Sequence, residues 1–279
     1  MIKRSVDALL FSSLWLALAA AAQALATLAL WAPLTAAGYR MAALVGAATL
    51  LVYNLDAVLP FKHRQPAGGS GRKGWQQRHR WALAGLAGAA ATTAAGLVCA
   101  DGWLRYATGL GPLAGLALLY SWPVWRWRGR RWALREVPLL KGFLIAGVWT
   151  AVTVGLPVLL HHPLNLVSVE KLVGQRFCLV AALTVVFDLR DLSRDRAAGL
   201  ATLPVWLGPA GAKAVALGLL AGALAFGLWR GTGQGILGIT VGLATAVVLA
   251  AREGRSEYFF ALLADGVLLV PAVLYLVFN

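Results

Sequence analysis

Charged residues are scarce in this 279-residue sequence: Asp, Glu, Lys and Arg make up 13% of it, about half the share in a typical soluble domain. Cysteines are scarcer still, and the two present, Cys99 and Cys178, lie inside apolar stretches. No disulfide framework and no cysteine or histidine spacing of a metal site is therefore present. These shortages exclude a disulfide-stapled scaffold and argue against a soluble enzyme.

Apolar residues are abundant instead. They make up 60% of the chain and recur in stretches of about 20 residues, the length that a transmembrane helix needs. We predict an all-α polytopic membrane protein, one domain over residues 1–279, with nine transmembrane helices around a central cavity and the N-terminus inside. The predicted spans are 8–31, 39–60, 80–100, 106–125, 138–160, 168–190, 210–229, 235–251 and 258–278.

The 25 Lys and Arg residues fall mainly in short loops between the apolar stretches. With the N-terminus inside, most of them lie on the inner face, as the positive-inside rule requires. The net charge of +14 then indicates orientation and an anionic substrate rather than nucleic acid. We expect an integral protein of a bacterial inner (plasma) membrane, with its active site on the cytoplasmic side.

Three acids, Asp188, Asp191 and Asp195, end the sixth predicted span in the stretch "TVVFDLRDLSRDRAAGLATLPVWLG". On a continuous helix these acids fall within about 60° of one another. The negative end of the helix dipole and their mutual repulsion both disfavour that arrangement. Either the interleaved arginines compensate at a solvated helix end, or Mg²⁺ does so while holding a diphosphate.

This D-x-x-D-x-x-x-D pattern, with the "RAAGLATLPVWLG" that follows, resembles the second aspartate-rich motif of the UbiA superfamily of intramembrane prenyltransferases. "LLYSWPVWRWRGRRWALREVPLLKGF" resembles the basic stretch between helices four and five of that family. The resemblance implies Mg²⁺-dependent transfer of an isoprenyl chain from a prenyl diphosphate to an aromatic or other lipophilic acceptor within the membrane. A terpene cyclase, or a non-catalytic isoprenoid-lipid binder or transporter on the same scaffold, stays an alternative.

The first motif of that family, N-D-x-x-D-x-x-x-D, is degenerate here. The corresponding stretch is "LVYNLDAVLPFKHR". With Asp56 as the middle acid, Tyr53 and Pro60 occupy the flanking acid positions. With Asn54 as the leading Asn, the acid positions hold Leu55, Val58 and Lys62, so at most one carboxylate remains in either register. Three accounts are open: one Mg²⁺ with basic residues taking over phosphate charge, a divergent branch with another substrate, or lost catalysis.

The resemblance assigns metal ligation and catalysis to four acids: Asp188, Asp191, Asp195 and Asp56. It assigns substrate binding to a second set, mostly polar and basic: Asn54, Lys62, Arg64, Tyr120, Arg130, Arg131, Lys141, Arg190 and Asp265. A carboxylate at mid-span is costly, so Asp265 is expected to face the bundle interior, on the cavity wall or in a structural pair. Two other expectations concern Arg176, predicted to be an outer-interface anchor, and Trp149, predicted to be a packing residue.

Overall fold

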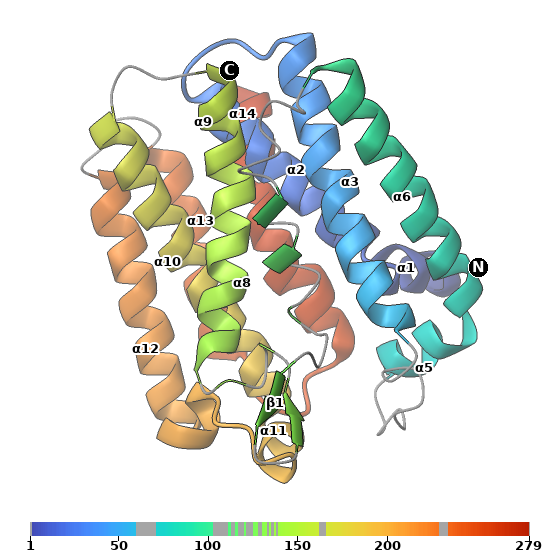
Figure 1. Ribbon diagram of the computed structural model, residues 1–279. Coiled ribbons are helices and arrows are strands. Elements are labelled where there is room, and N and C mark those ends of the chain that lie inside the picture. Colours follow the sequence, from blue (N-terminus) through green and yellow to red (C-terminus); the bar gives the residue numbers. More distant parts are fainter. Residues whose placement is uncertain are drawn as a thin grey trace.

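The computed structural model describes residues 2–59, 71–102, 111–112, 115–116, 120, 125–127, 130–132, 134, 137, 139–161, 166–228 and 234–278. Helices dominate these ranges and run roughly along one direction (Figure 1). Six helices are long and apolar enough to cross a membrane, and α1 and α2 together make a seventh if their bent pair counts as one span. The chain is thus an integral membrane protein of largely helical architecture.

The first two helices, α1 (Ile2–Phe11) and α2 (Leu14–Ala29), meet at an angle of 57°. Ser12 and Ser13 form the break, and Ser13 adopts a left-handed backbone conformation with φ 64°. Three other groups bond to this break: the amide of Asn54 to the Ser12 carbonyl, Arg72 to the Ser13 hydroxyl, and Gln76 to the Phe11 carbonyl. A break so held is a fixed feature of the fold.

A layer at one side of the bundle consists of α3 (Ala36–Val58) and α6 (Arg80–Ala100), joined by the short α5 (Gly71–Arg78). Figure 1 shows α3 and α6 side by side, and α2 packs against α3. Thr35 caps the start of α3, because its side chain accepts a hydrogen bond from the Gly38 N–H. Alanine-rich sequences in α2 and α6 allow the backbones to approach closely.

The centre of the bundle is α10 (Leu166–Arg190), which packs between α12 (Leu203–Leu228) and α8 (Leu140–Thr150). Beyond α8, the π-helical turn η3 (Ala151–Gly155) and α9 (Leu156–His161) continue the same span. Gly208, at φ 72°, and Pro209 kink α12 near its start.

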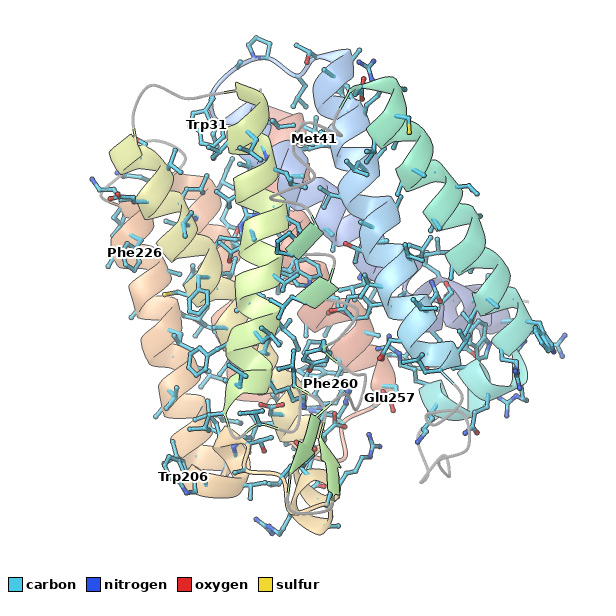
Figure 2. All side chains as sticks on the ribbon, viewed as in Figure 1. Trp31, Met41, Trp206, Phe226, Glu257 and Phe260 are labelled. Atoms are coloured by element: carbon cyan, nitrogen blue, oxygen red, sulfur yellow. The ribbon has the colours of Figure 1, made fainter. Side chains whose placement is uncertain are left out.

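The remaining helices close the bundle. They are α13 (Gln234–Ala250), η4 (Phe259–Ala264), η5 (Val267–Leu269) and α14 (Val270–Phe278). Figure 2 places Glu257 and Phe260 toward the end of the bundle where Trp206 lies, and Trp31 and Met41 at the other end.

Most predicted spans agree with this arrangement. The span expected over 8–31 is wrong as a single straight helix, because the 57° break at Ser12 and Ser13 falls inside it. The span expected over 106–125 lies largely outside the described residues, so nine spans and an inside N-terminus stay predictions. The all-α fold class is confirmed, and besides the helices β1 (Trp125–Trp127) and β2 (Arg130–Trp132) form a small antiparallel hairpin in the basic loop. Arg176 is no interface anchor: it is 6% exposed, because α10 is surrounded by other helices.

Candidate active site

A cavity of about 190 Å³ lies between α2, α3, α5, α8, α10 and the helix that begins at η4. One end of this cavity is polar, and the other is apolar. The polar end is lined by Arg72, Lys141, Asp188, Arg190, Asp191 and Asp265. The apolar end is lined by Leu16, Ile145, Val180, Leu183 and Leu268. Such a cavity suits an amphiphile with a charged head and an apolar tail.

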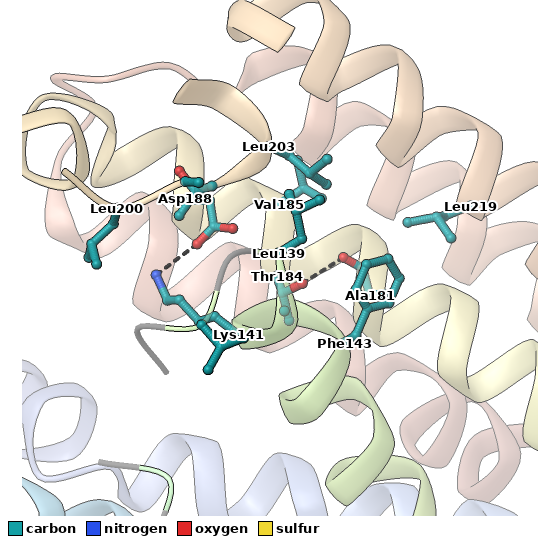
Figure 3. A pocket seen from close by; sticks show the side chains of 14 residues that line it. Leu139, Lys141, Phe143, Ala181, Thr184, Val185, Asp188, Leu200, Leu203 and Leu219 are labelled. Atoms are coloured by element: carbon teal, nitrogen blue, oxygen red, sulfur yellow. Dashed lines mark hydrogen bonds and ion pairs between the residues drawn. The ribbon is translucent and has the colours of Figure 1, made fainter. Parts of the chain in front are cut away.

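Lys141 links two of the predicted acids. Its ammonium donates to Asp188 Oδ1 at 2.7 Å and lies 3.8 Å from Asp195 Oδ2. Figure 3 shows the Lys141–Asp188 contact beside Leu139 and Leu200. The Leu139 N–H donates to the Ala201 carbonyl at 3.1 Å, which ties the start of α8 to the chain that follows the acids. The segment that follows the acids thus helps to position the lysine.

The close approach of α8 to α10 depends on Gly142. A Cβ atom at this position would lie 2.8 Å from the Thr184 hydroxyl oxygen, closer than real Cβ contacts come. The Thr184 hydroxyl donates a hydrogen bond to the Ala181 carbonyl, which Figure 3 marks with a dashed line. Gly142 follows Lys141 on α8, and Thr184 lies one turn before Asp188 on α10, so this approach brings the ion pair within bonding distance.

The acidic trio does not lie on one continuous helix, which corrects the expected geometry. α10 ends at Arg190, and a separate short helix, α11 (Leu192–Ala197), carries Asp195. The Ser193 N–H of α11 donates to the Glu253 carboxylate at 2.9 Å, which satisfies one free donor at the start of this helix. The Asp195 carboxylate on α11 lies 3.8 Å from the Lys141 ammonium.

Asp191 pairs with arginines instead. Arg190 donates to both of its carboxylate oxygens, at 3.2 and 3.0 Å, and Arg194 donates at 3.1 Å. The Arg190 guanidinium also lies over the rings of Phe187 and Phe260, a cation–π arrangement that holds it in place. The interleaved arginines therefore compensate the charge of this acid, which is the first of the two alternatives that the charge pattern leaves open.

The electrostatic states of the two acids beyond α10 differ accordingly. Burial acts to raise the pKa of the Asp191 carboxyl, but Arg190, Lys141 and Arg194 together outweigh burial and lower this pKa below its ordinary value. Burial raises the pKa of Asp195, and the Lys141 ammonium opposes that effect only in part. Asp191 is thus the more firmly ionised of the two.

Metal-binding capacity at this site rests on two carboxylates rather than three. Within the described ranges, no three Asp, Glu, His or Cys side chains lie close enough together to hold one metal ion. Asp188 and Asp195 nevertheless face one cationic group, the Lys141 ammonium. Two carboxylates fit Mg²⁺, which commonly takes one or two of them plus phosphate oxygens.

A second set of groups enters the cavity from α3, α5 and η4. Tyr53 accepts a hydrogen bond at its hydroxyl from the Trp149 indole N–H, 3.4 Å away. Asp265, 8% exposed, faces the cavity as expected and interacts electrostatically with Arg72 and Arg190. Trp149, predicted to be a packing residue, is buried and also lines the cavity.

Of the predicted substrate-binding residues, only Lys141, Arg190 and Asp265 line this cavity among the described residues. Asn54 is fully buried and uses its amide to donate to the Ser12 and Leu50 carbonyls. Asp56 is half-buried near the end of α3 and is not part of the described cavity wall. The remaining predicted residues can be placed only in part.

Tyr120 is half-buried in a turn. Arg130 and Arg131 lie in β2, but their side chains are outside the described part, as are Lys62 and Arg64 altogether.

Sequence reasoning missed Arg72, Tyr53, Thr184 and the role of Trp149. Two of them had a visible signal, because Lys141, Ile145 and Trp149 are spaced four apart, and so are Val180, Thr184 and Asp188. Each series forms a stripe along one face of a helix. Arg72 had no such signal, since it reaches the cavity from a basic, Gly-rich stretch that reads as a linker.

No protein-family model matches this chain, and no curated protein matches it. A solved structure does: the apo structure of a UbiA homologue from Aeropyrum pernix K1, with a TM-score of 0.65 and 23% sequence identity. The match covers 94% of this chain and 97% of that chain. The resemblance to the UbiA superfamily is thereby confirmed at the level of the fold, over nearly the whole length of both chains.

Proposed function

We propose that this chain, folded like a UbiA homologue, belongs to that superfamily and transfers an isoprenyl chain from a prenyl diphosphate to a lipophilic acceptor, such as an aromatic ring, within the membrane. One observation carries the proposal: a single cavity joins the charged group around Lys141 and Asp188 to an apolar wall. A prenyl diphosphate has the same division between an anionic head and an apolar tail. The UbiA-like fold supports this assignment.

Basic residues at the polar end would hold the diphosphate. Lys141, Arg72 and Arg190 line this end, and ammonium and guanidinium groups make strong, charge-assisted hydrogen bonds to phosphate oxygens. Arg72 lies beside the degenerate first motif, where the family pattern calls for further carboxylates. We therefore propose that Arg72 neutralises phosphate charge that a second metal ion would otherwise take.

Asp188 and Asp195 are the residues that would hold Mg²⁺, with Lys141 turning from them to the diphosphate. When bound, Mg²⁺ would supply positive charge beside the diphosphate as negative charge grows on it. The Arg190–Asp191 pair would keep the guanidinium fixed beside this head group. Preorganised charge of this kind lowers the barrier without reorganisation during the reaction.

The reaction would break the bond between C1 of the isoprenyl chain and the diphosphate oxygen, and the bonding electron pair would leave with diphosphate. An electron pair of the acceptor would then form the new bond to C1, and the acceptor would lose a proton. The ring of Phe187 lines the cavity beside the Arg190 guanidinium, where it would stabilise the allylic cation. The apolar wall would keep water from it.

The test is release of diphosphate by the purified full-length protein with Mg²⁺, isoprenyl diphosphates of several lengths and lipophilic aromatic acceptors. Asp188→Asn should reduce release by a factor on the order of 100, as expected when one preorganised charge is lost. Asp101→Asn is the matched control, since this carboxylate pairs with Arg40 away from the cavity. Absence of release with every chain length and acceptor would refute the proposal and favour a non-catalytic binder or transporter.

A further inference from the structure

A buried polar layer lies beyond the apolar end of the cavity. It consists of Gln23, Thr27, Thr153 and Arg176, each at most 6% exposed. The Arg176 guanidinium donates to Thr153 Oγ1 at 2.9 Å, to Thr27 Oγ1 at 3.2 Å and to the Gln23 carbonyl at 3.5 Å. These bonds tie α2, η3 and α10 together across the interior of the bundle.

This polar layer begins one helical turn beyond the last residues of the cavity wall. Trp149 lines the cavity, and Thr153 follows it four residues later and donates to its carbonyl at 2.7 Å. On α10, Val180 lines the cavity and Arg176 precedes it by four residues. Leu268 lines the cavity as well, while its carbonyl accepts from the Gln23 amide. Contacts on three sides thus place the layer at the end of the cavity.

A second, smaller cavity of about 60 Å³ lies on the other side, and Gln23 and Arg176 form part of its wall. An apolar tail that continued from the first cavity into the second would have to pass between these side chains. It has no polar atom to replace the hydrogen bonds that Arg176 would lose, and a buried arginine without such bonds is strongly disfavoured. The polar layer therefore stops a tail more firmly than apolar side chains would.

The distance from the charged head to the polar layer sets the length of tail that fits. Asp188 and Val180 mark the two ends of the cavity on α10, eight residues or about 12 Å apart at 1.5 Å per residue. An isoprene unit contributes four main-chain carbons, which span about 5 Å at ordinary carbon–carbon bond lengths. Resting on the proposed function, we infer that the substrate is a short prenyl diphosphate of two isoprene units, and that Trp149 and the Arg176 layer exclude longer chains.

The experiment measures diphosphate release, and thermal stabilisation of the full-length protein in detergent, with Mg²⁺ and prenyl diphosphates of one to four isoprene units. We expect kcat/KM to fall at least about tenfold from two units to three, the loss that one hydrogen bond to a charged group would produce. Trp149→Ala, which removes the ring before the layer, should restore much of the activity with three units. Leu28→Ala, fully buried on α2 but not on the described cavity wall, should leave the profile unchanged.

The outcomes separate this inference from the proposed function. Equal release with two, three and four units would overturn the length limit and leave the transferase standing. Stabilisation without release would overturn the transferase, and the cut-off would then be read from stabilisation. Neither release nor stabilisation with any chain would overturn both. If Trp149→Ala does not fold, Trp149→Phe makes the same comparison with a smaller change, and the wild-type profile is decisive by itself.

Discussion

Replacing Lys141 by Met tests whether this lysine holds the two acids together. At 2.7 Å and an effective dielectric constant near 20, the attraction between Lys141 and Asp188 is about 6 kcal/mol before desolvation is counted. Removing one partner of a buried pair typically destabilises a protein by about 3–5 kcal/mol. Lys141 is 23% exposed at its side chain, so solvent screening favours the lower value. We expect a loss of about 3 kcal/mol, which lowers the thermal midpoint by roughly 6 to 12 °C.

The loss of the Lys141 charge also predicts how the thermal midpoint of the variant responds to Mg²⁺. Without Lys141, Asp188 and Asp195 are left as two facing carboxylates, so Mg²⁺ should raise the midpoint of Lys141→Met more than that of the wild type. Adding Asp188→Asn should recover much of the lost stability in the absence of metal, because the repulsion is removed. Thermal unfolding in detergent, followed with chelator and with Mg²⁺, measures each term. A Lys141→Met protein as stable as the wild type under chelator would refute the reasoning.

Two further predictions concern the parts that position this pair. Gly142→Val should lower kcat/KM for diphosphate release about tenfold or more, because its Cβ would meet Thr184 at 2.8 Å and push α8 away from α10. Gly147→Ala is the control and should leave kcat/KM unchanged, because the space beside Gly147 on the same helix is open. Equal losses in the two variants would contradict the role of the close helix approach. The hydrogen bond from Ser193 lowers the pKa of Glu253, so the stability that Glu253 contributes is present above its ordinary pKa and is lost as pH falls through the lowered value. Glu253→Gln should therefore lower the free energy of unfolding by less than about 1 kcal/mol near neutral pH and leave it unchanged in strong acid. A difference in unfolding midpoint between the variant and the wild type that stays the same at every pH would argue against this bond.

The membrane helices could be predicted because their signal is local. Hydropathy locates α3, α6 and α10 within a few residues, since an apolar stretch of this length has few other stable structures. The kink at Gly208 and Pro209 also has a local signal, because Gly allows a positive φ and Pro removes a helical hydrogen bond.

The site could be predicted only in part, because its geometry depends on contacts between distant segments. The stretch after Arg190 contains no Gly or Pro before Gly199, so nothing in it predicts that the helix breaks at Asp191. At that break Asp191 pairs with Arg190 and Arg194. The entry of Arg72 into the cavity depends on α1, α2 and α5 together, and no local pattern encodes such an arrangement.

The bend at Ser12 and Ser13 is bonded to both α3 and α5. Straightening it would release the amide of Asn54, the guanidinium of Arg72 and the amide of Gln76 at once. The position of the Arg72 guanidinium in the cavity thus depends on Ser13, which precedes it by 59 residues in the sequence. A change in the angle between α1 and α2 would therefore displace Arg72 at the polar end of the cavity.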